Sequence, residues 1–233
     1  SGRRKLFTCP YHAWAYDTAG QLVRAPYMED AQSFTEKDCA LPLIRSEIWE
    51  GFILANLDPQ AEPLAPQIAS CTRYFENYRL GDMAIARTLD YEHDWNWKVL
   101  VENFMEAYHH IGTHAQTFEP IYPAALSRTP DNDGPWSILN MPAGAPHEDE
   151  APALLPDLTE AERNALVAAV IFPHFMIATF STGATWYQVF PTGAGGLRLK
   201  IHILLPKAVL AAPDAEALVE GMAAMTAHVH AED

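Results

Sequence analysis

The chain has 233 residues, of which 49% are hydrophobic, so it can form one large domain or two modest ones, and global disorder is not expected. Its formal net charge of -15 argues against a nucleic-acid-binding protein, for which a basic surface is typical. Three cysteines do not make a disulfide framework, no apolar run is long enough to span a membrane and no signal peptide is visible, so a cytoplasmic location is expected.

The first part of the chain, residues 5–58, reads as short β segments joined by turns. Residues 17–20 have the composition of a hairpin turn between strands near residues 14–16 and 21–23. Residues 48–57 alternate in polarity, which fits one long strand or part of a strand pair, and Asp58-Pro59 ends the pattern. Three prolines within residues 59–66 predict a boundary, and therefore two domains, 1–58 and 59–233.

The second part mixes helical and strand patterns. A strand is predicted at 84–94, a central helix at 95–110, an irregular surface segment at 127–157 and β runs at 171–180, 185–190 and 197–205. Further helices are predicted at 67–78, at 159–169 behind a capping sequence, and at 213–229. Strands followed by helix, strands and helix predict an α+β fold with an antiparallel sheet.

Two groups of residues have the composition of metal sites. Cys9 and His12 are a Cys/His pair at ligand spacing, whereas Cys39 and Cys71 have no such partner. Glu106, His109 and His114 lie in an apolar segment, and two neutral imidazoles with one carboxylate can hold Fe(II) and leave positions open for O₂. The carboxylate ligand could be Glu106 or an acid from elsewhere in the chain. The ordinary alternative is that the histidines have a purely structural, hydrogen-bonded role.

The spacing of the two histidines sets a geometric condition. If residues 95–110 form one helix, Glu102, Glu106 and His109 share a face. His114, five residues after His109, lies about 140° away on a straight helix. The two imidazoles can therefore share a metal only if the helix is distorted, and Gly112 is a residue that tolerates such a break.

These residues carry a resemblance to a known family. The chain contains, in this order, Asn96-Trp97-Lys98, Glu102-Asn103, Glu106, Tyr108-His109 and His114. This series resembles the catalytic domain of Rieske non-haem iron oxygenase α subunits. The segment Cys9-Pro10-Tyr11-His12-Ala13-Trp14 resembles the second half of a Rieske motif. Ala13 stands in place of the usual glycine, so slight strain is expected in this turn. The resemblance covers essentially the whole chain. It implies a partial Rieske [2Fe–2S] β domain followed by a helix-grip domain, an antiparallel sheet with a long helix.

The resemblance also implies roles for individual residues. Cys9 and His12 would ligate a [2Fe–2S] cluster, whose upstream Cys-x-His half would precede Ser1. His109, His114 and Asp233, the last residue, would ligate a mononuclear iron, although Asp233 could also be an ordinary acid at a helix end. Glu106 would bridge to a cluster histidine of a neighbouring subunit and orient His109. The chain is therefore expected to be cut at both ends.

The implied activity is hydroxylation of a small organic substrate with O₂ and with electrons from NAD(P)H. The electrons would come through a flavin reductase, in some cases with a ferredoxin, and the assembly would be a homotrimer or α3β3. An aromatic compound or a quaternary amine fits as substrate, with cation–π contacts from Trp186 and Tyr187 in the second case. The apolar pocket residues expected are Phe104, Met105, Phe118, Ile121, Phe172, Met176, Phe180, Trp186 and Val189.

Two other classes of protein account for part of the sequence. A Rieske electron-transfer protein without oxygenase activity explains residues 9–14, but not Glu106, His109 and His114. A non-enzymatic helix-grip ligand-binding domain explains the second half, but needs no pair of histidines and carboxylate. Mono- or dioxygenation stays open.

Overall fold

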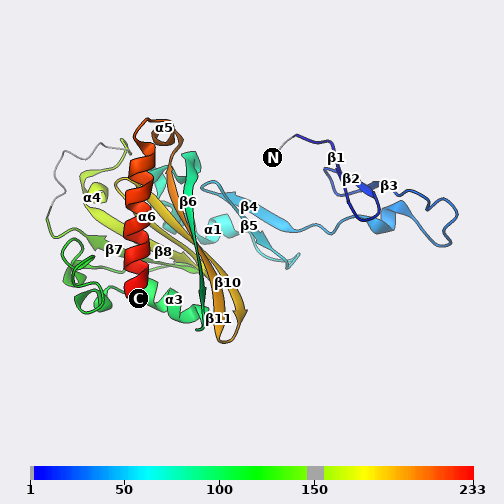
Figure 1. The fold of residues 1–233 in the computed structure, drawn as a ribbon. Coiled ribbons are helices and arrows are strands. Elements are labelled where there is room, and N and C mark those ends of the chain that lie inside the picture. Colours follow the sequence, from blue (N-terminus) through cyan, green and yellow to red (C-terminus); the bar gives the residue numbers. More distant parts are fainter. Residues whose placement is uncertain (1–2, 146–154) are drawn as a thin grey trace. The chain divides into compact units, whose positions relative to one another are not determined.

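The computed structural model describes residues 3–145 and 155–233, and the chain divides into two compact units (Figure 1). Unit 1 consists of residues 1–48 and 53–62, and unit 2 of residues 49–52 and 63–233. The functional boundary that we place at residue 59 remains a proposal. No helix in the described part of the chain has the length and apolar character that a membrane span requires.

Unit 1 contains a small antiparallel sheet of β1 (Leu6–Thr8), β2 (Ala15–Asp17) and β3 (Leu22–Arg24). The turn expected after β2 is present, because the Asp17 side chain accepts hydrogen bonds from the Ala19 and Gln21 amides, both at 2.9 Å. The segment 48–57 contains two strands, β4 (Arg45–Trp49) and β5 (Phe52–Asn56). Glu50 and Gly51 between them both have positive φ, so the single long strand is excluded.

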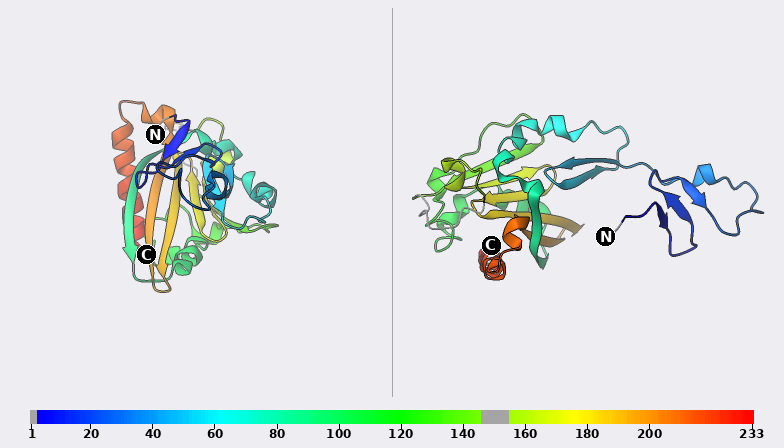
Figure 2. Two further views of the ribbon diagram at one scale, coloured as in Figure 1. Left: turned by 90° about the vertical axis from the view of Figure 1, so that its right-hand side faces the viewer. Right: turned by 90° about the horizontal axis from the view of Figure 1, so that it is seen from above.

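Unit 2 is built on a six-stranded antiparallel sheet in the order β6-β11-β10-β9-β8-β7. This confirms the predicted α+β fold. Its strands are β6 (Met83–His93), β7 (Trp136–Pro142), β8 (Ala165–Ile171), β9 (Phe175–Phe180), β10 (Gly183–Gly193) and β11 (Gly196–Pro206). The long helix α6 (Ala215–Glu232) crosses one face of the sheet, and the right-hand view of Figure 2 shows it end-on below the strands.

The remaining helices are short. They are α1 (Leu64–Gln67), α2 (Ala69–Thr72), α3 (Trp97–Phe104), α4 (Glu160–Arg163) and α5 (Lys207–Leu210). The helix predicted at 67–78 is therefore wrong in form, since the segment breaks into α1, α2 and a 3₁₀ turn at Glu76–Tyr78. The apolar residues whose helical spacing led to this prediction do face the core, because Ile68, Cys71, Phe75 and Tyr78 are all fully buried.

The central helix predicted at 95–110 is also wrong. Helix α3 begins after Asn96, whose side chain accepts a hydrogen bond from the Lys98 amide at 3.0 Å, and it ends at Phe104. A separate 3₁₀ turn, Tyr108–Ile111, follows. The face shared by Glu102, Glu106 and His109 therefore does not exist, because Glu106 and His109 lie beyond the helix.

Three further predictions need correction. The helix at 159–169 has its predicted capping box at Thr159, but ends at Arg163, and Ala165–Ile171 is the buried strand β8. Sheet pairing outweighs the helix propensity of the alanines there. The β run 171–180 is split between β8 and β9, and strand β7 lies within the segment predicted as irregular. The rest of that prediction falls in part on residues 146–154, outside the described residues.

Neighbouring residues of β10 face opposite sides of the sheet, as strand geometry requires. Trp186 packs against Phe52 and Phe175, with ring centroids 5.1 and 6.2 Å away, and stacks on His202. Tyr187 lies on the other face, against Phe104 at 4.9 Å. Trp186 and Tyr187 therefore cannot form one cation–π site.

Candidate metal centre

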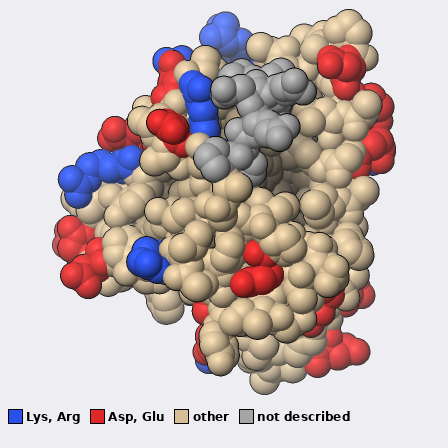
Figure 3. All heavy atoms as spheres, turned by 90° about the vertical axis from the view of Figure 1, so that its left-hand side faces the viewer, with Lys and Arg blue, Asp and Glu red and all other residues tan. Residues whose placement is uncertain are grey.

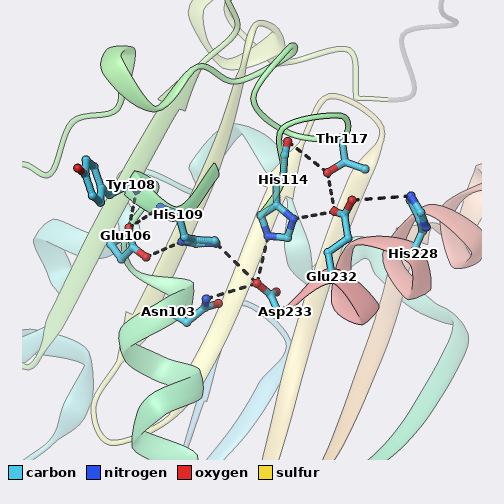
Figure 4. Close-up of polar contacts among 9 residues, drawn as sticks. All are labelled: Asn103, Glu106, Tyr108, His109, His114, Thr117, His228, Glu232 and Asp233. Carbon is cyan, nitrogen blue, oxygen red and sulfur yellow. Dashed lines mark hydrogen bonds and ion pairs between the residues drawn. The ribbon is translucent and has the colours of Figure 1, made fainter. Parts of the chain in front are cut away.

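Three side chains that are far apart in the sequence meet at the end of α6 (Figure 4). His109 lies on the 3₁₀ turn Tyr108–Ile111, His114 follows it, and Asp233 comes directly after α6. The Nε2 atom of His114 is 3.2 Å from Asp233 Oδ1, and that of His109 is 3.8 Å from the same oxygen. One ligand atom of each residue lies within 4.8 Å of the others.

The backbone after α3 explains how the two imidazoles meet. The Glu106 carboxylate accepts hydrogen bonds from the Tyr108 amide and, at 3.2 Å, from the His109 amide. A side chain that binds these amides competes with helix continuation and starts the 3₁₀ turn instead. The His109 and His114 rings then lie 5.0 Å apart. The predicted distortion is thus present but begins before His109, and Gly112 keeps a negative φ of -101°.

Each histidine has a carboxylate on its Nδ1 side. Glu106 Oε1 is 2.5 Å from His109 Nδ1, and Glu232 Oε2 is 2.7 Å from His114 Nδ1. Burial alone would raise the pKa of Glu106, but the hydrogen bonds from His109 and Tyr108 outweigh it and hold this pKa below its ordinary value. An ionised carboxylate can only accept, so both imidazoles donate through Nδ1.

This tautomer leaves a lone pair on each Nε2 atom facing the Asp233 carboxylate. Lone pairs and a carboxylate oxygen repel one another unless a proton or a cation lies between them. Two imidazoles and one carboxylate match the ligand set of non-haem Fe(II) sites, which keep open positions. The residues therefore fit a mononuclear iron, and the Nδ1 partners match the carboxylate–histidine pairs that support metal ligands.

The candidate metal centre lies at one end of a cavity of about 540 Å³. Residues of α6 from Ala217 onwards and Asp233, directly after the helix, line it, and this stretch corresponds to about 24 Å along the helix axis. Four residues of the predicted pocket, Phe104, Phe118, Ile121 and Phe180, line this cavity. The other five do not: Met105, Met176 and Val189 pack in the core, Phe172 is 73% exposed, and Trp186 lies on the opposite face of the sheet.

The cavity is nearly uncharged away from the metal centre. No Lys or Arg occurs among the described residues that line it, and Glu106 and Asp233 are its acids. Burial lowers the pKa of His110 and His230, so both are neutral at pH 7, and burial beside Asp233 raises the pKa of Tyr187. On the face drawn in Figure 3, most of the surface is uncharged, with acidic and basic side chains scattered over it.

Cys9 and His12 lie in one tight turn of unit 1. The Cys9 amide donates to the Trp14 carbonyl at 2.8 Å, and the Ala13 amide donates to the Cys9 carbonyl at 3.0 Å. Ala13 has a φ of 57°, in the region that favours glycine, which agrees with the strain expected from this substitution. Cys9 is exposed, and the pair can provide two of the four ligands of a [2Fe–2S] cluster.

Three residues of the centre carry no role in the sequence interpretation: Glu232, Thr117 and Asn103. Thr117 Oγ1 donates to Glu232 Oε2 at 2.6 Å, and Asn103 Nδ2 donates to Asp233 Oδ1 at 3.4 Å. The only sequence signal is that Glu232 adjoins Asp233 and that Asn103 follows Glu102 in the motif. The hydrogen bonds of Glu232 with Thr117 and His114, and that of Asn103 with Asp233, each join residues more than a hundred positions apart. Residue spacing could therefore not predict them.

Comparison with known sequences identifies the family of this chain. Residues 80–233 match the family "Ring hydroxylating alpha subunit (catalytic domain)", and residues 2–35 match the "Rieske [2Fe-2S] domain". The alpha subunit of benzene 1,2-dioxygenase from Pseudomonas putida is 36% identical over 120 residues, which are 48% of this chain and 26% of that subunit. The carnitine monooxygenase oxygenase subunit of Acinetobacter baumannii is 33% identical over 113 residues, 47% of this chain and 30% of that subunit. The matched segments thus span less than a third of these relatives.

Solved structures show the same fold. A quaternary ammonium Rieske monooxygenase, CntA, in complex with γ-butyrobetaine matches with a TM-score of 0.73 at 22% identity, over 94% of this chain and 56% of that one. Naphthalene 1,2-dioxygenase with indole bound matches with a TM-score of 0.72 at 20% identity, over 94% and 56%. Because the matching family model covers more than half of the sequence, this chain belongs to the ring-hydroxylating alpha subunit family, and a Rieske segment precedes its catalytic domain.

Proposed function

We propose that this chain is the catalytic part of a Rieske-type oxygenase α subunit, with His109, His114 and Asp233 as ligands of one Fe(II). The observation that carries the proposal is the meeting of two Nε2 atoms and one carboxylate oxygen at the end of an apolar cavity. Iron bound there would supply the capacity to use O₂ for oxidation of the substrate. The protein positions the substrate and limits access of water.

The chain's own residues divide this work. Phe104, Phe118 and Tyr187 form cavity walls that hold an apolar substrate next to the metal ligands. Asn103 restrains Asp233 through its 3.4 Å hydrogen bond. Glu106 orients His109 through Nδ1. Neither a pure electron carrier nor a metal-free ligand binder needs this combination of cavity and ligand set.

For the substrate we propose an uncharged, elongated, mainly apolar molecule, with an aromatic compound as first choice. The cavity follows α6 for about 24 Å, and its described lining offers no basic side chain to bind a carboxylate. A quaternary amine is the second candidate, because Tyr187 and three phenylalanines line the cavity, and aromatic rings can bind such a cation through their π faces.

The test is incorporation of isotopically labelled O₂ into product by protein that carries both halves of the cluster site. A reductase and NAD(P)H drive turnover, with matched sets of neutral arenes and quaternary amines offered as substrates. We expect label in an arene product, with one or two labelled atoms distinguishing mono- from dioxygenation. If only the amine products carried label, a quaternary amine would replace the aromatic compound as the proposed substrate. If the protein bound iron but formed no labelled product, the oxygenase proposal would be contradicted.

The redox partners follow the same proposal. Cys9 and His12 would provide two of the four ligands of a [2Fe–2S] cluster, and residues 1–233 contain no Cys-x-His pair that could provide the other two. A flavin reductase, with or without a ferredoxin, would supply electrons from NAD(P)H. The cytoplasmic location favoured by the cysteine content is part of the proposal.

We also propose assembly as a homotrimer or α3β3 that brings a neighbouring subunit to Glu106. The Glu106 side chain is 44% exposed, and beside it in the sequence Tyr108 and Ile111 are 83% and 58% exposed. Large apolar side chains exposed together are typical of protein–protein contacts. A solved quaternary ammonium Rieske monooxygenase with the same fold has been described in terms of inter-subunit electron transfer.

Replacing Ile111 with aspartate should therefore weaken the assembly, because the contact would have to bury a charge. We expect a smaller mass in light scattering and loss of turnover, with metal binding retained. Ile85→Asp is the matched control, since Ile85 is 52% exposed on β6. An unchanged mass for Ile111→Asp, or an equal effect of both variants, would contradict this choice of interface.

A further inference from the structure

The two histidines of the candidate metal centre are supported in different ways. The partner of His109, Glu106, also binds two backbone amides. His114 is 1% exposed, and its ring lies between two consecutive residues, with Glu232 on the Nδ1 side and Asp233 on the Nε2 side (Figure 4). Thr117, also buried, fixes the Glu232 carboxylate by donating to the same oxygen that accepts from His114.

A neutral imidazole carries its proton on either nitrogen, and the two forms have opposite consequences here. With the proton on Nδ1, His114 donates to Glu232, and its Nε2 lone pair is free to bind a cation. With the proton on Nε2, the ring can donate to Asp233 Oδ1, 3.2 Å away. That hydrogen bond would occupy both groups and block the metal site without any metal present.

We propose that Glu232, held in place by Thr117, is a positioning residue that keeps the proton of His114 on Nδ1 and its Nε2 atom available to a metal ion. The inference rests on the proposed iron site but concerns the apoprotein, in which the choice between the two tautomers is made. The competing view is that Glu232 only anchors the end of α6 through its contacts with Thr117 and His114.

The first measurement needs neither metal nor turnover. Long-range proton–nitrogen NMR correlations report which imidazole nitrogen of His114 carries the proton in the metal-free protein. We expect the Nδ1–H form in the wild type and a shift towards Nε2–H in Glu232→Ala. In Glu232→Gln the amide oxygen can still accept from Nδ1, so the wild-type tautomer should largely be retained.

The second measurement is the affinity for Co(II), a spectroscopic substitute for Fe(II), by titration. Outer-shell partners of metal ligands typically contribute about 10- to 100-fold in affinity, and we expect a loss in this range for Glu232→Ala. Glu232→Gln and Thr117→Val should lose less. The control is Glu220→Ala, on the same helix, whose side chain pairs with Arg87 at 2.5 Å outside the centre.

The outcomes separate the two proposals. If Glu232→Ala keeps the His114 tautomer and the Co(II) affinity and only loosens the last turn of α6 in hydrogen exchange, Glu232 is an anchor and the inference is wrong. If the tautomer shifts as expected but the wild-type protein binds neither Co(II) nor Fe(II), the iron site fails while the positioning role stands. The Gln variant, close in shape to the wild type, keeps the test decisive if the Ala variant does not fold.

Discussion

Replacing His114 with alanine is expected to remove the mononuclear metal and to abolish substrate oxidation. His114 is buried, and its Nε2 atom is the ligand closest to Asp233, so the variant leaves one imidazole and one carboxylate. The loss of affinity should exceed the roughly 100-fold upper range that is typical of outer-shell partners. It is measured by Co(II) or Fe(II) titration of the purified protein and by the metal content after dialysis.

A second variant and a control make this result interpretable. Asp233→Asn alters a partly exposed group directly after α6, and this variant should also lose the metal. Because the substitution leaves no cavity in the core, a loss of metal here cannot be attributed to unfolding of the core. His174→Ala removes a histidine that contacts the Trp97 ring and does not line the cavity, so metal binding should persist. Tight, stoichiometric metal binding by His114→Ala would show that the metal lies elsewhere.

Replacing Gly221 with phenylalanine is expected to block the substrate while the metal stays bound. Gly221 lines the cavity in the middle of α6, and a Cβ atom built there meets nothing within 4 Å. The new ring would therefore occupy space that the substrate needs. If the steric cost to the bound substrate resembles that of overpacking a core, about 1–3 kcal/mol, kcat/KM should fall about 5- to 150-fold for substrates that extend to this position.

The size series at position 221 shows whether the effect is steric. Gly221→Ala should keep activity and raise the free energy of unfolding by about 0.5–1 kcal/mol, because alanine is the better residue inside a helix. Short substrates that end near Asp233 should tolerate Gly221→Phe better than long ones. Equal loss for short and long substrates, or loss of the metal, would contradict a substrate path along α6.

The local patterns of the sequence were sufficient for the fold class and for most of the strands. The hairpin turn after β2 follows from Asp17, whose side chain binds the turn amides, and from Gly20 at a φ of 79°. The capping residues of α4 behave as their spacing predicts. These features depend on neighbours in the chain, and that is why they can be predicted from short stretches.

Predictions of helices failed where other hydrogen bonds, either from a nearby side chain or from neighbouring strands, outweigh the helix preference of the sequence. The sequence after Phe104 favours a helix, but the Glu106 carboxylate binds the Tyr108 and His109 amides and starts a 3₁₀ turn. The alanines of β8 favour a helix as well, yet the strand is paired on both sides by β7 and β9. In both cases hydrogen bonds made by the folded chain replace those of the expected helix.

The sequence by itself determined the kind of chemistry, because Glu106, His109 and His114 lie close together and Cys9 and His12 form a recognisable pair. Only the tertiary structure decided which acid faces both imidazoles, since Asp233 reaches them by the packing of α6 across the sheet. The same packing brings Glu232 to His114 and places Tyr187, but not Trp186, on the cavity. The physical reason is that ligand geometry and cavity shape depend on distances between remote segments, which residue spacing along the chain does not contain.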